Sequence, residues 1–167
     1  MKKLFLLALV ALSTVAFGQQ KIKLGHLNSN DLMAVMPGRD SAEKVLNDYA
    51  KNLQDQLNAM MNEFQTKYQE YLDNSEKYLE PVKKAKEKEL SDLQNRIEEF
   101  KNQSQELLSK KEQELIQPLI DKAKKAISDV ARERGYTYIF DVSAGSLLYY
   151  QDSDDIMPYV KEKLGIK

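Results

Sequence analysis

Residues 41–72, SAEKVLNDYAKNLQDQLNAMMNEFQTKYQEYL, decide the fold of this chain. Apolar residues such as Leu53 and Leu57 recur every three or four positions, so they share one face of a helix. The same stripe continues to the end of residues 41–134, a region with no glycine and only two prolines. The pattern predicts one long helical element that folds back on itself.

The two prolines divide this element. Pro81 lacks an amide proton but fits the first turn of a helix, so we expect the tip of a helical hairpin near residues 73–81. Pro118 lies inside a continuing apolar pattern and predicts a kink; both prolines are candidate hinges. Polar residues, including Ser104, interrupt the stripe, which favours a loosely paired hairpin over a rigid coiled coil.

Short β-type segments flank the helical region and predict a small body at the base of the hairpin. Gly135 is placed to end the long helix. The body is expected to comprise residues 19–40 and 135–167, with strands at 21–27, 136–142 and 147–150 and a terminal helix at 154–164. The last two strands were expected to form a hairpin around a glycine-containing turn. Because such a body buries little of the apolar stripe, the composition indicates an oligomer.

The first 18 residues have the layout of a secretory signal peptide. Lys2 and Lys3 precede an apolar run that is too short to span a bilayer, and small residues follow up to Gly18. We expect cleavage near Gly18 and export of the remaining chain. Without Lys2 and Lys3, the chain has 23 basic and 26 acidic residues. It therefore has no net positive charge that would attract nucleic acid.

Groups that could converge in a catalytic site are scarce. The chain has no cysteine, and its only histidine, His26, was expected to face solvent or to lie at a sheet edge. No glycine-rich phosphate loop or paired-histidine metal motif occurs. The acidic residues Asp152, Asp154 and Asp155 are better explained as a helix cap than as a calcium site. We therefore predict a protein that is not an enzyme and that binds neither cofactor nor metal.

Two groups of hairpin residues are candidates for contact with partners. Aromatic and methionine side chains in the stripe either pack the hairpin or line a surface that adapts to unfolded polypeptides. A second, basic group near the tip is either a solvated surface or a weak contact for anionic membranes. The first group comprises Met60, Met61, Phe64, Tyr68, Tyr71 and Tyr78; the second comprises Lys83, Lys84, Lys86 and Lys88.

The order of elements resembles the Skp/OmpH family of periplasmic outer-membrane-protein chaperones. The residues that carry the resemblance are Ala126 to Ala131 (AISDVA), Tyr138 to Val142 (YIFDV) and Ile22 to Leu32 (IKLGHLNSNDL). The resemblance implies a homotrimer in which strands form a shared β-barrel body and three hairpins, or tentacles, surround a client cavity. It also implies ATP-independent binding of unfolded outer-membrane proteins. Family members can be strongly basic, whereas this chain is mildly acidic.

The fold class expected from the sequence is therefore mainly α with a small β body, from which a long antiparallel helical hairpin projects. The expected function is that of a periplasmic holdase; the alternatives are a coiled-coil spacer of the cell envelope and an amphipathic membrane binder. Candidate body and oligomer contacts are Ile22, Leu24, Tyr138, Phe140, Val142, Leu147 and Tyr149.

Overall fold

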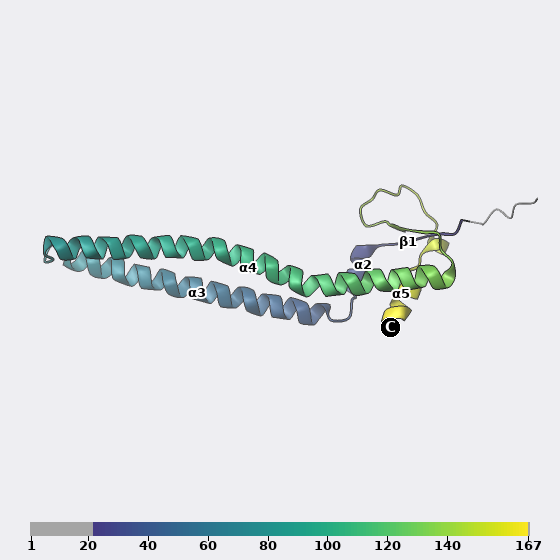
Figure 1. Cartoon of the computed structure of the whole chain (residues 1–167), viewed down its shortest axis with the longest axis horizontal. Coiled ribbons are helices and arrows are strands. Elements are labelled where there is room, and N and C mark those ends of the chain that lie inside the picture. The colour runs from purple at the N-terminus through teal and green to yellow at the C-terminus, as the bar shows by residue number, and fades with distance from the viewer. Residues whose placement is uncertain (1–21, 167) are drawn as a thin grey trace, which may run out of the picture.

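A computed structural model describes residues 22–166, so the proposed signal peptide at 1–18 lies outside the described residues. Figure 1 shows a long two-helix hairpin that projects to one side of a small body. This arrangement confirms a mainly helical fold built around a helical hairpin. The elements are β1 (Leu24–Leu27), α2 (Ser29–Ala34), α3 (Arg39–Asn74), α4 (Glu80–Arg134), β2 (Tyr138–Asp141), the short 3-10 helix η2 (Asp152–Asp154) and α5 (Met157–Leu164).

Helices α3 and α4 form the hairpin and are joined by a turn at residues 75–79. Their apolar stripes face each other, with Leu93 only 1% exposed, while most other stripe residues remain half-buried because only two helices meet. Helix α3 begins at Arg39, two residues before the expected boundary at 41. Gly38 is the N-cap and has a left-handed conformation with φ of 97°, which glycine adopts without strain. The sequence also offers Asp40 or Ser41 as a cap, but both lie inside the helix, and no side chain caps it.

The two prolines of the hairpin occupy different positions in α4. Pro81 lies in the first turn, where a missing amide proton removes no helical hydrogen bond. Pro118 lies inside α4, which remains one helix from Glu80 to Arg134. Figure 1 shows that α4 changes direction along its length before it reaches the body.

The sheet of the body pairs the two ends of the chain in parallel. Leu24 lies opposite Tyr138, and His26 lies opposite Phe140. Both strands are shorter than the predicted ranges 21–27 and 136–142, and Lys21 lies outside the described residues. The sheet has these two strands within residues 22–166.

The predicted strand at Leu147–Tyr150 is wrong, and so is the predicted strand hairpin. After a turn in which Gly145 N–H donates to the Val142 carbonyl, this segment forms an irregular loop (Figure 1). β2 pairs with β1 instead, and the other edge of β1 is occupied by Asp155 through a parallel bridge with His26. The two edges of β1 are therefore already used by other segments.

The final helix is also shorter than the predicted range 154–164. Residues 152–154 form η2, and α5 starts at Met157, whose N–H donates to Asp155 Oδ1 at 2.8 Å. The expected capping role of this acidic segment is thus performed by Asp155.

The core of the body lies between α4, α2, the inner face of the sheet and α5. Its buried members are Leu27, Leu32, Met36, Ala123, Ala126, Val130, Ile156 and Val160. Gly25 permits the close approach of α5 to the sheet, since a Cβ atom there would lie 2.8 Å from Ile156 Cγ2. This small core fixes the base of the hairpin.

Candidate polypeptide-binding surfaces

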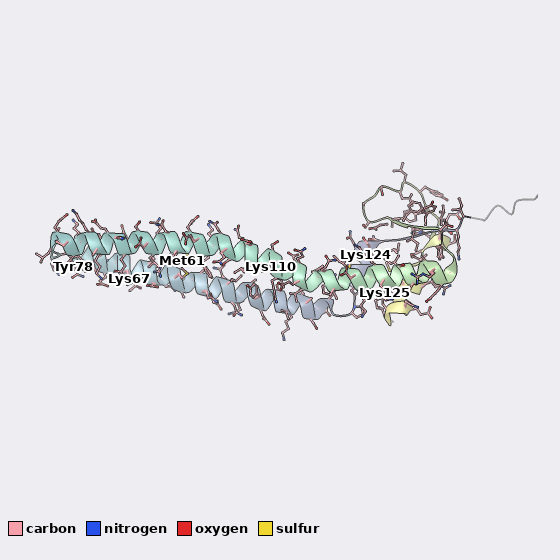
Figure 2. The ribbon with its side chains drawn as sticks, viewed as in Figure 1. Met61, Lys67, Tyr78, Lys110, Lys124 and Lys125 are labelled. Carbon is pink, nitrogen blue, oxygen red and sulfur yellow. The ribbon has the colours of Figure 1, made fainter. Side chains whose placement is uncertain are left out.

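A groove opens on the hairpin about midway along its length, and we call it the mid-hairpin groove. Its volume is about 680 Å³, and both helices contribute to its walls. Figure 2 places Met61, one of its residues, between the tip, marked by Tyr78, and the body. The groove is lined by Asn58, Met61, Asn62, Phe64, Gln65, Tyr68, Gln94, Ile97 and Glu98.

The lining of this groove combines apolar and aromatic side chains with amide side chains. The rings of Phe64 and Tyr68 stack with their centroids 5.9 Å apart and their planes 7° from parallel. Met61 is 51% exposed, so its flexible thioether is available to a ligand. Asparagine and glutamine side chains can both donate to and accept from peptide groups, and Glu98 is the only ionisable carboxylate or ammonium group in this lining.

The structure brings only some of the expected client-contact residues to the groove. Met61, Phe64 and Tyr68 line it, whereas Met60 is half-buried beside it and Tyr78 lies at the tip. The α4 wall, with Gln94 and Ile97, was not included among the candidates. The helical period identifies a face of one helix, but it does not give the register between two helices.

Tyr71 is held within the hairpin by a polar contact. Its hydroxyl donates to Glu87 Oε1 at 2.5 Å, and this hydrogen bond raises the pKa of Tyr71 to about 12. Nearby, Lys67 Nζ lies 2.5 Å from Glu89 Oε1, and Lys86 Nζ lies 3.3 Å from a Glu70 oxygen. The hydrogen bond from Lys67 lowers the pKa of Glu89. Polar cross-links thus join the helices on the tip side of the groove.

On the body side of the mid-hairpin groove, two further grooves open along the hairpin. A second groove of about 320 Å³ contains Ser104, whose buried hydroxyl has no hydrogen-bond partner within residues 22–166. A third, of about 640 Å³, lies beside Tyr49 and Phe100. The polar interruption at Ser104 therefore coincides with incomplete packing of the seam.

The four lysines expected at the tip lie in the first turns of α4 but differ in their surroundings. Lys84 and Lys88 are exposed, Lys83 is half-buried, and Lys86 is paired with Glu70 and Glu89. Only part of this group is therefore free to meet an outside anion.

The outer face of the sheet carries exposed apolar side chains, and we call it the sheet-face patch. Leu24, Tyr138 and Phe140 point to this face, and the rings of Tyr138 and Phe140 lie 6.5 Å apart. Ile22 and Tyr149 are also exposed, whereas Val142 and Leu147 are half-buried. Leu148, which was not among the candidates, is 98% exposed.

His26 is buried, so the expectation that it faces solvent is wrong. It shares the outer face of the sheet with Leu24, but the loop after β2 covers it. The Tyr150 ring lies 4.2 Å from the imidazole, centroid to centroid, and the Gln151 carbonyl lies 3.0 Å from Nε2. A single sequence gives no sign of this cover because the loop comes from the opposite end of the chain.

Asp141 joins the end of β2 to the start of α2. Its Oδ1 accepts hydrogen bonds from the backbone N–H groups of Ser29 at 3.1 Å and Ser143 at 2.9 Å. Partial burial raises the pKa of this carboxyl, but the hydrogen bonds from Ser29 and Ser143 outweigh it and lower the pKa to about 2. The charged Asp141 carboxylate therefore links Ser29, near the start of the body, to the loop that follows β2.

Two further observations describe the whole molecule. Among residues 22–166, no three histidine, aspartate or glutamate side chains are arranged to hold a metal ion. In the same part of the chain, none of the helices combines the length and the apolar character that a membrane crossing requires.

A long two-helix hairpin set on a small body with a two-stranded parallel sheet defines a class of mainly helical, hairpin-built proteins. The chain belongs to the family of OmpH-like outer membrane proteins, whose family model matches residues 23–164. Proteins of this Skp/OmpH family are periplasmic chaperones without enzymatic activity. No curated protein sequence matches the chain.

Proposed function

We propose that this protein is an ATP-independent periplasmic holdase that binds unfolded outer-membrane proteins and prevents their aggregation. The mid-hairpin groove carries this proposal. Its apolar and aromatic side chains fit the apolar side chains of an unfolded polypeptide, and its amide side chains fit the exposed peptide groups. Because the groove is open and shallow, each contact is weak, and many such contacts together hold a client.

The test is the aggregation of an outer-membrane β-barrel protein diluted from urea, followed by light scattering without ATP. The wild-type protein is expected to suppress scattering at a few-fold excess. The variant Met61→Gln/Tyr68→Gln should need several times more protein for the same effect. Both residues are about half exposed, so the fold should tolerate the change.

A matched control variant distinguishes the effect of changing the groove from the effect of removing exposed apolar surface in general. Val45→Gln/Leu72→Gln changes two side chains of similar exposure outside the groove, and it should behave like the wild type. Failure of the wild-type protein to suppress aggregation would favour the spacer function. Equal activity of both double variants would move the client contacts away from the mid-hairpin groove.

We further propose that the sheet-face patch forms the contact between copies in a homotrimer. The patch combines aromatic and aliphatic side chains that a single chain leaves exposed. Sedimentation equilibrium should give a mass near three chains. Phe140→Lys should lower this mass, whereas Leu79→Lys, at the exposed tip, should not change it. A dimer in the wild type would contradict the proposal.

The lysines near the tip are proposed to make weak contact with anionic membrane surfaces. Co-sedimentation with vesicles containing phosphatidylglycerol should fall at high salt and in the variant with glutamine at Lys83, Lys84, Lys86 and Lys88. A control with glutamine at Lys101, Lys110, Lys122 and Lys124, all exposed on α4, should retain binding. Equal binding of the two variants would refute a role for the tip.

Localisation in the periplasm requires export, which we attribute to residues 1–18. Mass spectrometry of the protein recovered from the periplasm should show a new N-terminus after Gly18. An intact N-terminus would identify these residues as a retained anchor.

A further inference from the structure

A cleft of about 360 Å³ on the body is separate from the hairpin grooves. It lies where the end of β1, the start of α2, the loop after β2 and the start of α5 meet. Its walls are formed by His26, Asn28, Asp31, Val142, Tyr150, Asp152, Asp155, Met157 and Lys161. The proposed holdase activity does not use this cleft.

The charge of this cleft is predominantly negative. Three carboxylates, those of Asp31, Asp152 and Asp155, line it together with the single ammonium group of Lys161. Asp155 uses Oδ1 to accept from the Met157 N–H. Within residues 22–166, the side chains of Asp31, Asp152 and Lys161 form no hydrogen bond or ion pair, so the negative charge is not neutralised locally.

His26 supplies a second, independent observation at the same cleft. It is only 6% exposed, and its Nε2 lies 3.0 Å from the Gln151 carbonyl oxygen. A carbonyl oxygen only accepts, so Nε2 carries the hydrogen and Nδ1 of the neutral ring is an acceptor. Among the described residues Nδ1 has no partner, although buried polar atoms are usually paired.

The wall beside His26 is aromatic. The Tyr150 ring lies 4.2 Å from the imidazole, centroid to centroid, and it also lines the cleft. Tyr150 is 43% exposed, so part of its ring remains accessible, and the face of an aromatic ring attracts a cation. The cleft thus combines carboxylates, a buried acceptor without a donor, and an aromatic face.

We propose that this cleft binds the side-chain cation of a polypeptide, an arginine guanidinium or a lysine ammonium group. The carboxylates of Asp31 and Asp152 neutralise its charge, Tyr150 covers its face, and binding opens the wall of the cleft at His26, so that the buried Nδ1 accepts one of its N–H groups. Arginine is the preferred ligand because its planar, multiply donating group can satisfy a carboxylate and the imidazole together.

The experiment uses the only histidine of the chain as a reporter. The imidazole C–H resonances of His26 are followed by NMR in the assembled protein during titration with N-acetyl-arginine amide. A saturable shift is expected, which weakens as salt is added. N-acetyl-citrulline amide, a neutral analogue of nearly the same shape, should produce no saturable shift. Equal shifts with both probes, or none with either, would overturn the proposal.

The site is then tested with Asp31→Asn/Asp152→Asn, which removes two charges without removing a hydrogen bond of the fold. The affinity for the arginine probe should fall by about five-fold or more. The control Glu99→Gln/Glu112→Gln removes two exposed charges from α4 and should leave the affinity within about two-fold of the wild type. An equal loss of affinity for the arginine probe in the two variants would mean that the probe is attracted by the overall negative charge and not by this cleft.

The assembled mass of the same variant shows whether the cation comes from a neighbouring copy or from a separate polypeptide. If Asp31→Asn/Asp152→Asn loses both arginine binding and assembled mass, the natural ligand is a basic residue of a neighbouring copy. If the mass is unchanged while arginine binding is lost, the ligand is a basic residue of a separate polypeptide. Retained arginine binding in this variant contradicts the site in either case.

Discussion

The Tyr71 hydroxyl donates a hydrogen bond of 2.5 Å to Glu87 Oε1 across the hairpin, and so ties α3 to α4 within about two turns of the tip. Most of the apolar stripe is only half-buried, so polar links of this kind contribute to holding the outer part of the hairpin together. The ion pairs of Lys67 with Glu89 and of Lys86 with Glu70 belong to the same region.

The hairpin tip should therefore loosen in alkali. The folded protein raises the pKa of Tyr71 from 10.0 to about 12, so the protonated phenol is the form that the fold stabilises. The stabilisation that the protonated Tyr71 phenol gives to the folded hairpin is complete below pH 10 and is lost as the pH rises through about 12. Hydrogen exchange by mass spectrometry at neutral pH should be faster around residues 70–88 in Tyr71→Phe. Exchange at the wild-type rate would show that the hydrogen bond does not hold the tip.

Glycine is required at position 25 for packing. Gly25→Ala would place a Cβ atom 2.8 Å from Ile156 Cγ2 and 3.0 Å from Tyr136 Cε1, inside a core where Ile156 is 0% exposed. We expect a loss of about 1–3 kcal/mol in the free energy of unfolding, measured by urea denaturation. Stability equal to the wild type in Gly25→Ala would contradict the close contact.

The hydrogen bonds that the Asp141 carboxylate accepts from Ser29 and Ser143 should make the body sensitive to acid. Its carboxyl is held ionised, with a pKa lowered from 3.8 to about 2, so its contribution is present above pH 3.8 and is lost as the pH falls through about 2. Asp141→Asn should be less stable than the wild type at neutral pH. The difference should narrow between about pH 4 and about pH 2, as followed by circular dichroism. A difference that does not change with pH would rule out the charge as its cause.

Removal of the buried hydroxyl at Ser104 should stabilise the hairpin. Ser104 Oγ is buried without a partner, and alanine also has the higher helix propensity. We expect Ser104→Ala to raise the free energy of unfolding by about 1 kcal/mol, measured by thermal and urea denaturation. Gln103→Ala, at an exposed neighbour on α4, shows the contribution of helix propensity alone. A loss of stability in Ser104→Ala would indicate that the hydroxyl has a partner such as water.

The sequence allowed the helical hairpin to be predicted because its evidence is local. The spacing of apolar residues, such as Leu53 and Leu57 in α3, shows directly which side of each helix is apolar. Ile97 belongs to the corresponding stripe of α4. The absence of glycine and the position of Pro81 place the turn between the helices. These features depend on neighbours three or four residues away, which a single sequence displays.

The body was harder to predict because its contacts join distant residues. The partner of β1 is β2, in parallel, and neither the orientation nor the register follows from two short apolar segments. The segment Leu147–Tyr150 has the composition of a strand but forms a loop, since Asp155 occupies the edge of β1. The burial of His26 depends on Tyr150, which lies 124 positions further along the chain, as the residue numbers show.

The parallel pairing of β1 with β2 also determines the order in which the protein can be completed. Lys23 N–H donates to Thr137 Oγ1 across a separation of 114 residues, so the sheet cannot form until the long hairpin has been made and has returned to its starting point. During synthesis β1 is made first, and it has no partner strand until β2, which follows the long hairpin in the sequence, has been made. The sheet of the body therefore forms only after both helices of the hairpin have been made, and α3 and α4 have time to pair before it.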